Sequence, residues 1–353
     1  MILFANAGSP LMLGSLLHLL FGNFGIGVLE GLILSLWFKR KWWLCIAIMI
    51  AANYFSAWIG YVFLGSKIAS GLAVDIYSLR QFLAAMILAT YLMTLALEWP
   101  FVAACFWKAE HWFRKSVVAT LLVQTVSYAL IFGWYWVTSS KSLLTNATAV
   151  AADQIPVADD LTLYYIADYG EVRSLHLRDG TSTVIGRLRN VGPYDRLLAR
   201  YSSSRDGSWD LVANHVSKGP KYERSLVRGN LHSKVALCEL DHEKAPVIGE
   251  NLRSWYSLGG GQSDWECNVG DWPWWGLSGR NIKTGETWRI ALEVPFLAWW
   301  VRDFVEVPGE KFIFQLGRDQ ICIFDARSHK IALLAKGFGP LVALDAATRV
   351  QGH

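Results

Sequence analysis

The sequence predicts a membrane α-helical bundle of about four transmembrane helices, followed by an extramembrane all-β domain. Three observations predict this fold class. Four long apolar stretches fill the first 137 of the 353 residues. Charged side chains make up 18% of the chain, against roughly 25% in an average soluble domain, and few of them lie in that first part. The rest of the chain is more polar and carries short strand-like segments separated by turn residues.

The four apolar stretches are each long enough to cross a bilayer. They run over residues 11–38, 42–64, 82–107 and 117–137. About 20 helical residues cross a hydrocarbon core roughly 30 Å thick. The apolar residues are continuous, not alternating, and a helix satisfies its own backbone hydrogen bonds within lipid. We therefore expect residues 1–137 to form a transmembrane helical domain.

The first stretch is unusual because three glycines and Asn23 interrupt it between residues 21 and 27. A straight helix over residues 10–38 would be about 43 Å long, which exceeds the bilayer core. Either this helix tilts strongly, or residues 10–21 lie at the surface or re-enter before the span begins near Asn23. The stretch lacks a basic leading segment and is too long for a cleaved signal peptide, so we expect a retained helix.

Basic residues between the apolar stretches predict the orientation. Residues 39–41 are all basic, and Lys108, Arg114 and Lys115 separate the last two stretches. Because loops rich in Lys and Arg stay in the cytoplasm, we expect the N-terminus and everything after residue 137 to lie outside it. The short loops and the lack of a targeting segment favour a bacterial inner membrane. The net charge of +4 then reports membrane orientation, and we expect no nucleic-acid partner.

Ionisable side chains within the apolar stretches are candidates for function, because burying them in lipid is costly. His18, Glu30 and Glu98 could line a pocket that binds a cation or passes protons. The structural alternative is favoured, since two carboxyls alone are thin evidence for a pathway. In that case Glu30 hydrogen-bonds to a neighbouring helix, and Glu98 satisfies polar groups near a kink at Pro100 or at a helix interface. His18 then lies at the level of the outer headgroups. The other polar side chains of these stretches include Asn23, Asn53, Gln124 and Ser127.

Gly27 and Gly31 form a Gly-x-x-x-Gly pair in the first stretch. This spacing leaves two bare patches on one helix face and lets another helix approach closely. We expect helices to pack laterally on this face, including those of other subunits. Glu30 lies beside the pair and should therefore face a helix, not lipid.

After the helices, we expect a linker over residues 138–160 and an extracytoplasmic β-rich domain over residues 161–353. Hairpin-like segments occur at residues 174–188, 209–227, 275–292 and 320–335, each around a polar turn. A weak strand–turn–strand repeat relates residues 165–193 to residues 312–340. These features predict a degenerate β-propeller, with a β-sandwich as the alternative.

Two aromatic segments of this domain are candidates for docking. Exposed tryptophans could stack on a sugar ring, enter the bilayer surface or bind a partner, whereas buried ones would fill the core. The first segment holds Trp272, Trp274 and Trp275, and the second holds Trp299 and Trp300.

The sequence contains no P-loop, Gly-x-Ser-x-Gly, His-Glu-x-x-His or Cys-x-x-Cys motif. The densest set of possible metal ligands, at residues 232–243, matches no spacing of a known site. We therefore expect neither catalysis nor a metal or other cofactor.

Cysteines give only weak signals. Cys45 and Cys105 lie in the apolar stretches and should act as small apolar side chains. Cys238 and Cys267 are a candidate disulfide if the compartment is oxidising, and Cys322 should be buried in a strand.

Three functions are compatible with this organisation. The first is a non-catalytic integral membrane subunit or scaffold of a larger assembly, whose partners are the lipid bilayer and other membrane protein subunits. The second is a transporter or channel that uses Glu30 and Glu98 to handle ions or protons. The third is a ligand-binding membrane sensor, which would need a partner to signal because only short loops face the cytoplasm.

Overall fold

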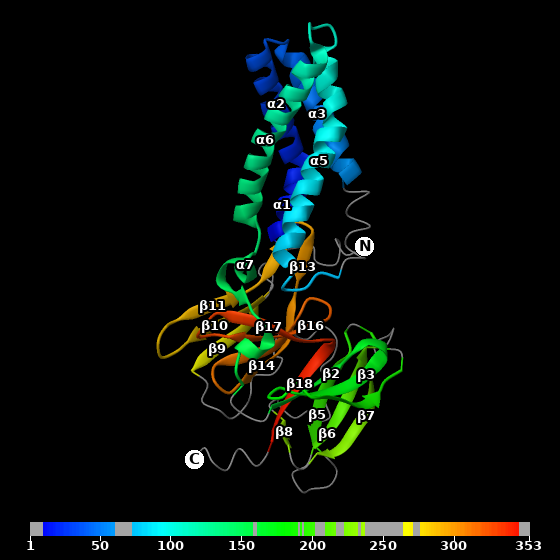
Figure 1. Cartoon of the computed structure of the whole chain (residues 1–353), viewed down its shortest axis with the longest axis vertical. Coiled ribbons are helices and arrows are strands. Elements are labelled where there is room, and N and C mark those ends of the chain that lie inside the picture. Colours follow the sequence, from blue (N-terminus) through cyan, green and yellow to red (C-terminus); the bar gives the residue numbers. More distant parts are fainter. Residues whose placement is uncertain are drawn as a thin grey trace. The chain divides into compact units, whose positions relative to one another are not determined.

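Four helices long and apolar enough to cross a membrane form the first unit of the chain, as predicted. They span Gly14–Phe38, Trp42–Gly60 (α3), Leu79–Phe106 (α5) and Trp112–Thr138 (α6). The computed structural model describes residues 10–60, 73–157, 161–189, 191–192, 194–201, 209–216, 222–231, 234–236, 264–270 and 276–345. The helical unit extends to Ser140 and includes Glu293–Ala298, and a β-rich unit contains most of the remainder (Figure 1).

The first span is helical throughout, with a π-helical turn in place of a break. It lies in a continuous helical segment that consists of α1 (Pro10–Leu17), the π-helix η1 (His18–Gly22) and α2 (Asn23–Phe38). The backbone stays right-handed at both junctions. Backbone groups in lipid must remain hydrogen-bonded, which favours a π turn over an interruption. Within this turn, the Tyr54 hydroxyl of α3 donates to the Leu20 carbonyl at 2.5 Å.

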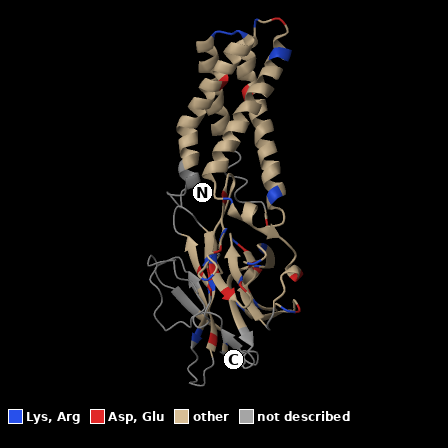
Figure 2. Ribbon diagram, turned by 90° about the vertical axis from the view of Figure 1, so that its left-hand side faces the viewer, with Lys and Arg blue, Asp and Glu red and all other residues tan. Residues whose placement is uncertain are grey.

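The two basic loops lie at the same end of the helical unit. The first joins α2 to α3, and the second joins α5 to α6. The Arg40 guanidinium lies 5.1 Å from the centroid of the Phe106 ring, so the first loop contacts the last residue of α5. Figure 2 shows basic positions at this end and few charges along the helices.

The second unit is built from several β-sheets. Its strands and those of the adjoining β12–β13 hairpin are β1 Thr148–Ala149, β2 Leu161–Ile166, β3 Glu171–His176, β4 Ser182–Arg187, β5 Arg196–Tyr201, β6 Trp209–Val216, β7 Tyr222–Leu231, β8 Lys234–Ala236, β9 Trp265–Gly270, β10 Gly276–Asn281, β11 Thr287–Ile290, β12 Leu292–Val294, β13 Leu297–Trp299, β14 Val301–Val307, β15 Lys311–Leu316, β16 Gln320–Asp325, β17 Lys330–Lys336 and β18 Phe338–Asp345. The five-stranded sheets have the orders β1-β17-β16-β15-β14 and β4-β3-β2-β18-β8, and the three-stranded sheets β11-β10-β9 and β5-β6-β7. None of these sheets closes on itself within the described ranges.

All four predicted hairpins are confirmed as antiparallel strand pairs. They are β3–β4, β6–β7, β10–β11 and β16–β17. Gly180 and Gly285 adopt positive φ in two of the turns, a conformation that glycine reaches without steric cost. The weak repeat corresponds to two antiparallel meanders, β2-β3-β4 and β15-β16-β17.

The core of the β unit lies between stacked sheets. One apolar cluster includes Leu163 of β2 and Ile323 of β16, and it joins the two five-stranded sheets. A second cluster includes Ile166 of β2 and Leu211 of β6, and it joins the other face of β2 to β5-β6-β7. All six residues of β2 are therefore buried, which explains why this strand lacks a clear alternation of apolar and polar residues.

The segment predicted as a linker belongs to the β unit from Lys141 onward. It contains the helix α7 (Ser142–Asn146), strand β1 and a 3₁₀ turn at Ala152–Gln154. Strand β1 pairs in parallel with β17, and Leu143 and Ile155 are buried. Residues 141–157 are thus a packed part of the domain.

Candidate functional site

Each of the four helices contributes polar side chains to one buried group, here called the carboxyl cluster. Glu30 and Glu98 are 0% and 1% exposed, although both are ionisable. The other members of the cluster carry amide or hydroxyl groups, and they are buried too. The cluster consists of Glu30 from α2, Asn53 and Ser56 from α3, Glu98 from α5, and Gln124 and Ser127 from α6.

The position of Glu30 follows from the close packing of α2 on α3. A Cβ atom at Gly27 would lie 2.6 Å from Cα of Ile50, and one at Gly31 would lie 2.4 Å from Cα of Ile46. Only glycine permits this approach, which brings Glu30 between the two glycines against α3. The glycine face is therefore occupied by α3 within the chain.

Glu30 accepts hydrogen bonds from two other helices. Asn53 Nδ2 of α3 donates to Glu30 Oε2 at 2.5 Å. Ser127 Oγ of α6 donates to Oε1, and Gln124 Nε2 of the same helix donates to Oε1 at 3.3 Å. Asn53 Nδ2 also donates to the Met49 carbonyl at 3.0 Å, which orients its amide. These bonds hold the Glu30 carboxyl in one place.

Glu98 is bound by the same two helices. Ser56 Oγ of α3 donates to Glu98 Oε1 at 2.5 Å, and Gln124 Nε2 of α6 donates to Oε2 at 2.5 Å. The Gln124 amide thus donates to both carboxyls and joins them. Pro100 lies two residues further along α5, which continues to Phe106.

The electrostatics of the cluster limit its charge. Among the described residues, every hydrogen bond to the two carboxyls comes from an amide or a hydroxyl group, and none from Lys, Arg or His. Two ionised carboxylates joined by one amide in a low-dielectric interior would repel each other. The arrangement favours at most one negative charge on the pair. Chemically, the cluster can hold a proton, or it can serve only to fix the helices.

His18 is placed elsewhere. It lies in η1, and its ring stacks on Tyr135 of α6 with centroids 5.6 Å apart. It takes part in none of the hydrogen bonds that the described residues make to Glu30 or Glu98. Of the three ionisable candidates, the structure therefore brings only the two glutamates together.

Sequence reasoning missed Ser56 and gave no role to Asn53, Gln124 or Ser127. One signal could have found them. Asn53 and Ser56 are three residues apart, as are Gln124 and Ser127. Side chains at this spacing share one helix face, so each apolar helix presents a polar pair in one direction. That direction is the inside of the helical unit.

The aromatic candidates do not form an exposed patch among the described residues. Trp299 is 6% exposed, and its ring lies against Gly317, where an added Cβ would approach Trp299 Cδ1 to 2.8 Å. Trp300 is partly buried. Trp272, Trp274 and Trp275 lie outside the described residues.

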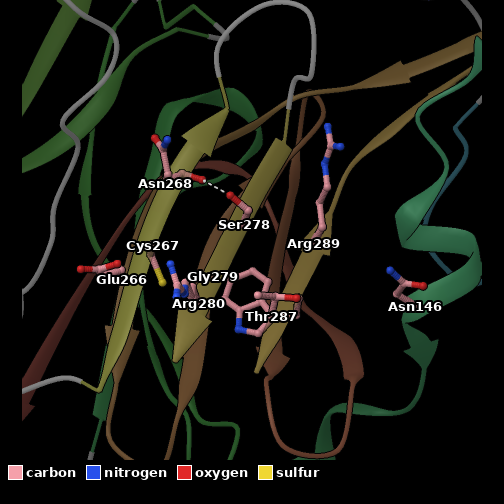
Figure 3. Close-up of a pocket in the computed structure, with 10 residues that line it drawn as sticks. Asn146, Glu266, Cys267, Asn268, Ser278, Gly279, Arg280, Thr287 and Arg289 are labelled. Atoms are coloured by element: carbon pink, nitrogen blue, oxygen red, sulfur yellow. Dashed lines mark hydrogen bonds between the residues drawn. The ribbon is translucent and has the colours of Figure 1, made fainter. Parts of the chain in front are cut away.

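The described part of the β unit carries a shallow hollow of about 510 Å³ on the sheet β11-β10-β9 (Figure 3). Alternate residues of these strands, Trp265 and Trp288, lie in the core beside Phe312. The intervening residues give the sheet a polar face that can offer hydrogen bonds to another molecule. The residues of this face that line the hollow are Glu266, Asn268, Ser278, Arg280, Thr287 and Arg289.

The two cysteines of the β unit that lie within the described ranges are Cys267 and Cys322. Cys322 is buried in β16, as predicted. Burial, with a smaller contribution from Glu306, raises the pKa of Cys267 to about 12, so its thiol stays protonated near neutral pH. Its predicted disulfide partner, Cys238, lies outside the described residues, as do all the possible metal ligands at residues 232–243. Within the described ranges, no three His, Cys, Asp or Glu side chains form a group that could hold a metal ion.

Comparison with known protein families, curated proteins and solved structures found no match.

Proposed function

We propose that this chain is a non-catalytic integral membrane subunit or scaffold, whose helical unit is an anchor and whose β unit docks other proteins. The observation that carries this proposal is the carboxyl cluster, in which all four helices are hydrogen-bonded to one another. A closed polar network of this kind fixes the relative position of helices in lipid. Together with the glycine contact between α2 and α3, it makes the helical unit a rigid anchor.

The β unit supplies the docking surface in this proposal. Its three-stranded sheet β11-β10-β9 presents a polar face with a hollow, and Glu266 and Arg280 on this face are exposed. We infer that its stacked sheets are those of a degenerate β-propeller. Strand β18, late in the chain, pairs with β2 from the start of the unit, as happens when a propeller closes.

The proposed location is a bacterial inner membrane, with the N-terminus and the β unit outside the cytoplasm. The two basic loops at one end of the helical unit support this orientation. A membrane-impermeant maleimide should label Ser328→Cys in the β unit of intact cells. It should label Glu110→Cys, in the second basic loop, only after the membrane is opened. The reverse labelling pattern would show that the N-terminus and the β unit lie in the cytoplasm.

The assembly proposal is tested by purifying the chain in mild detergent from its native membrane. We expect stoichiometric partner chains that are retained through size separation and identified by mass spectrometry. A charge reversal in the hollow, Arg280→Glu, should release those partners without changing the melting temperature of the chain. The exposed position Asp179→Lys, in the β3–β4 turn, is the matched control. A chain that elutes alone, as a monomer or a homo-oligomer, contradicts the proposal.

A second candidate function is proton handling by the carboxyl cluster. One observation favours it: the two buried carboxyls share the Gln124 amide, and no basic side chain bonds to either among the described residues. Buried carboxyls of this kind are common on proton pathways. Vesicles that contain the purified protein should then pass protons, and Glu30→Gln should abolish the flux. Equal flux through wild type and variant removes Glu30 from any such role.

A further inference from the structure

The tip of the β12–β13 hairpin belongs to the helical unit, although the hairpin lies late in the chain. Residues 293–298 group with the four helices, whereas the neighbouring strands β11 and β14 belong to the β unit. No charged side chain occurs from Val294 to Val301. An apolar segment thus leaves the β unit and lies with the membrane helices.

The hairpin is bonded to the chain just beyond the end of α6. The Glu293 amide donates to the Ser140 carbonyl at 2.6 Å, in an antiparallel bridge. Ser140 follows Thr138, the last residue of α6, by two residues. Antiparallel segments run in opposite directions. Because the chain leaves the helix through Ser140, the chain from Glu293 onward runs back toward the helix end.

The hairpin is long enough to reach the level of the last turns of α6. The three residues from Glu293 to Phe296 span at most about 10 Å, and Ser140 lies at most about 7 Å beyond the helix end. The last turns of α6 carry two exposed tryptophans, Trp134 and Trp136. Exposed tryptophans near the end of a membrane helix mark the boundary between hydrocarbon and water.

Phe296 is presented outward at the tip. Its side chain is 43% exposed, and its backbone φ is 76°. A bulky residue rarely adopts positive φ, whereas glycine reaches it without steric cost. The hairpin therefore holds an aromatic ring at a position where glycine would be less strained. Backbone outliers of this kind cluster at functional sites and ligand contacts.

We propose that residues 295–297, the tip of the β12–β13 hairpin, insert into the bilayer interface at the end of α6. Phe296 then lies among the lipid headgroups and the first carbons of the acyl chains, at the level of Trp134 and Trp136. The chain is held at the membrane in two places, through α6 and through this hairpin.

Lipid fits this tip better than a protein partner does. Protein interfaces surround their apolar core with a polar rim, and the segment from Val294 to Val301 has no charged side chain to supply one. Apolar and aromatic side chains are the ones that the bilayer interface accepts. The inference requires that the four helices cross a bilayer, and it does not depend on which proteins the β unit docks.

The experiment places a photoreactive side chain at the tip of the full chain. The variant Phe296→p-benzoylphenylalanine is purified, reconstituted in vesicles of phosphatidylethanolamine and phosphatidylglycerol, and irradiated. The excited ketone inserts into a neighbouring C–H bond, so the mass of the tip peptide identifies its neighbour. We expect a peptide whose mass is increased by one lipid molecule.

Two matched positions calibrate this result. Phe132→p-benzoylphenylalanine, at an exposed apolar position of α6, should give the lipid adduct. Tyr169→p-benzoylphenylalanine should give none. Tyr169 lies in the β2–β3 turn of the β unit, is 92% exposed and also has a positive φ, of 59°. The yield at Phe296 should approach that at Phe132.

The inference is overturned if Phe132 gives the lipid adduct and the tip peptide stays unmodified. A crosslink from the tip to a peptide of the chain's own helices overturns it as well. If Phe132 also gives no adduct, the inference fails together with the membrane assignment of the helices. Leu297→p-benzoylphenylalanine tests the same tip if the Phe296 variant does not fold, and it should give the same lipid adduct.

Discussion

Replacing Gly27 and Gly31 together with leucine should destroy the folded helical unit. A Cβ atom at either position would lie within 2.6 Å of an α3 backbone atom, and backbone cannot move aside as the end of a flexible side chain can. Overpacking costs about 1–3 kcal/mol of stability at a typical site. Because this variant has two backbone clashes in one interface, its loss of stability should be at or above the upper end of that range. Separating α2 from α3 also pulls Asn53 away from Glu30. Size analysis in detergent should show aggregate in place of a single species.

The matched control is Gly25→Leu in the same helix, combined with Gly133→Leu in α6. Nothing lies within 4 Å of an added Cβ at either position. Because leucine has a higher helix propensity than glycine by up to about 1 kcal/mol, the control should be as stable as wild type or slightly more so. If the Gly27/Gly31 double variant has the same melting temperature as this control, α2 and α3 do not pack as described.

Replacing Glu30 with leucine should have the second-largest effect. The substitution removes the acceptor for Asn53, Gln124 and Ser127, whose donors remain inside the helical unit. A buried donor left without its partner costs about 1–3 kcal/mol. Bonds between membrane helices average about 0.6 kcal/mol, because the separated helices find other partners in the membrane. The loss of three hydrogen bonds to Glu30 should still lower the melting temperature clearly. The melting temperature is measured from the loss of the helical circular dichroism signal on heating.

Glu30→Gln separates the loss of hydrogen bonding from the loss of charge. Its side-chain carbonyl can still accept from Ser127 or Gln124, so the fold should survive with a smaller change. If leucine and glutamine variants melt together at the wild-type temperature, the carboxyl cluster is not what holds the four helices. The anchor function proposed for it would then lose its main support.

The helices could be predicted from the sequence, but the carboxyl cluster could not. Long apolar runs show where helices cross a membrane, because the length and the hydropathy of each run are enough to identify a span. Which side chains of two helices meet depends on the rotation of each helix about its axis and on which helices are neighbours. Glu30 and Glu98 were selected individually, because each is costly to bury in lipid. The hydrogen bonds from Gln124 to both carboxyls could be predicted only if the helix rotations and the helix neighbours were known. Ser56 was missed because a single serine is common in membrane helices.

The β unit was predictable where strands have one exposed face. The hairpins around Gly180 and Gly285 were found because polar turns and partial alternation mark them. Strands buried on both faces, such as β2 and β15, carry no such alternation. Sequence left open whether Trp299 is exposed or buried for a related reason, since it does not reveal that the Trp299 ring lies against Gly317.

The pairing of β18 with β2 has a consequence for synthesis of the chain. Strand β2 lies between β3 and β18, so its second edge stays open until residues 338–345 have left the ribosome. An open strand edge can pair with other chains, and contacts between distant residues form slowly. Every nascent β unit therefore passes through a period with an unprotected edge, and that edge is where a chaperone would have most effect.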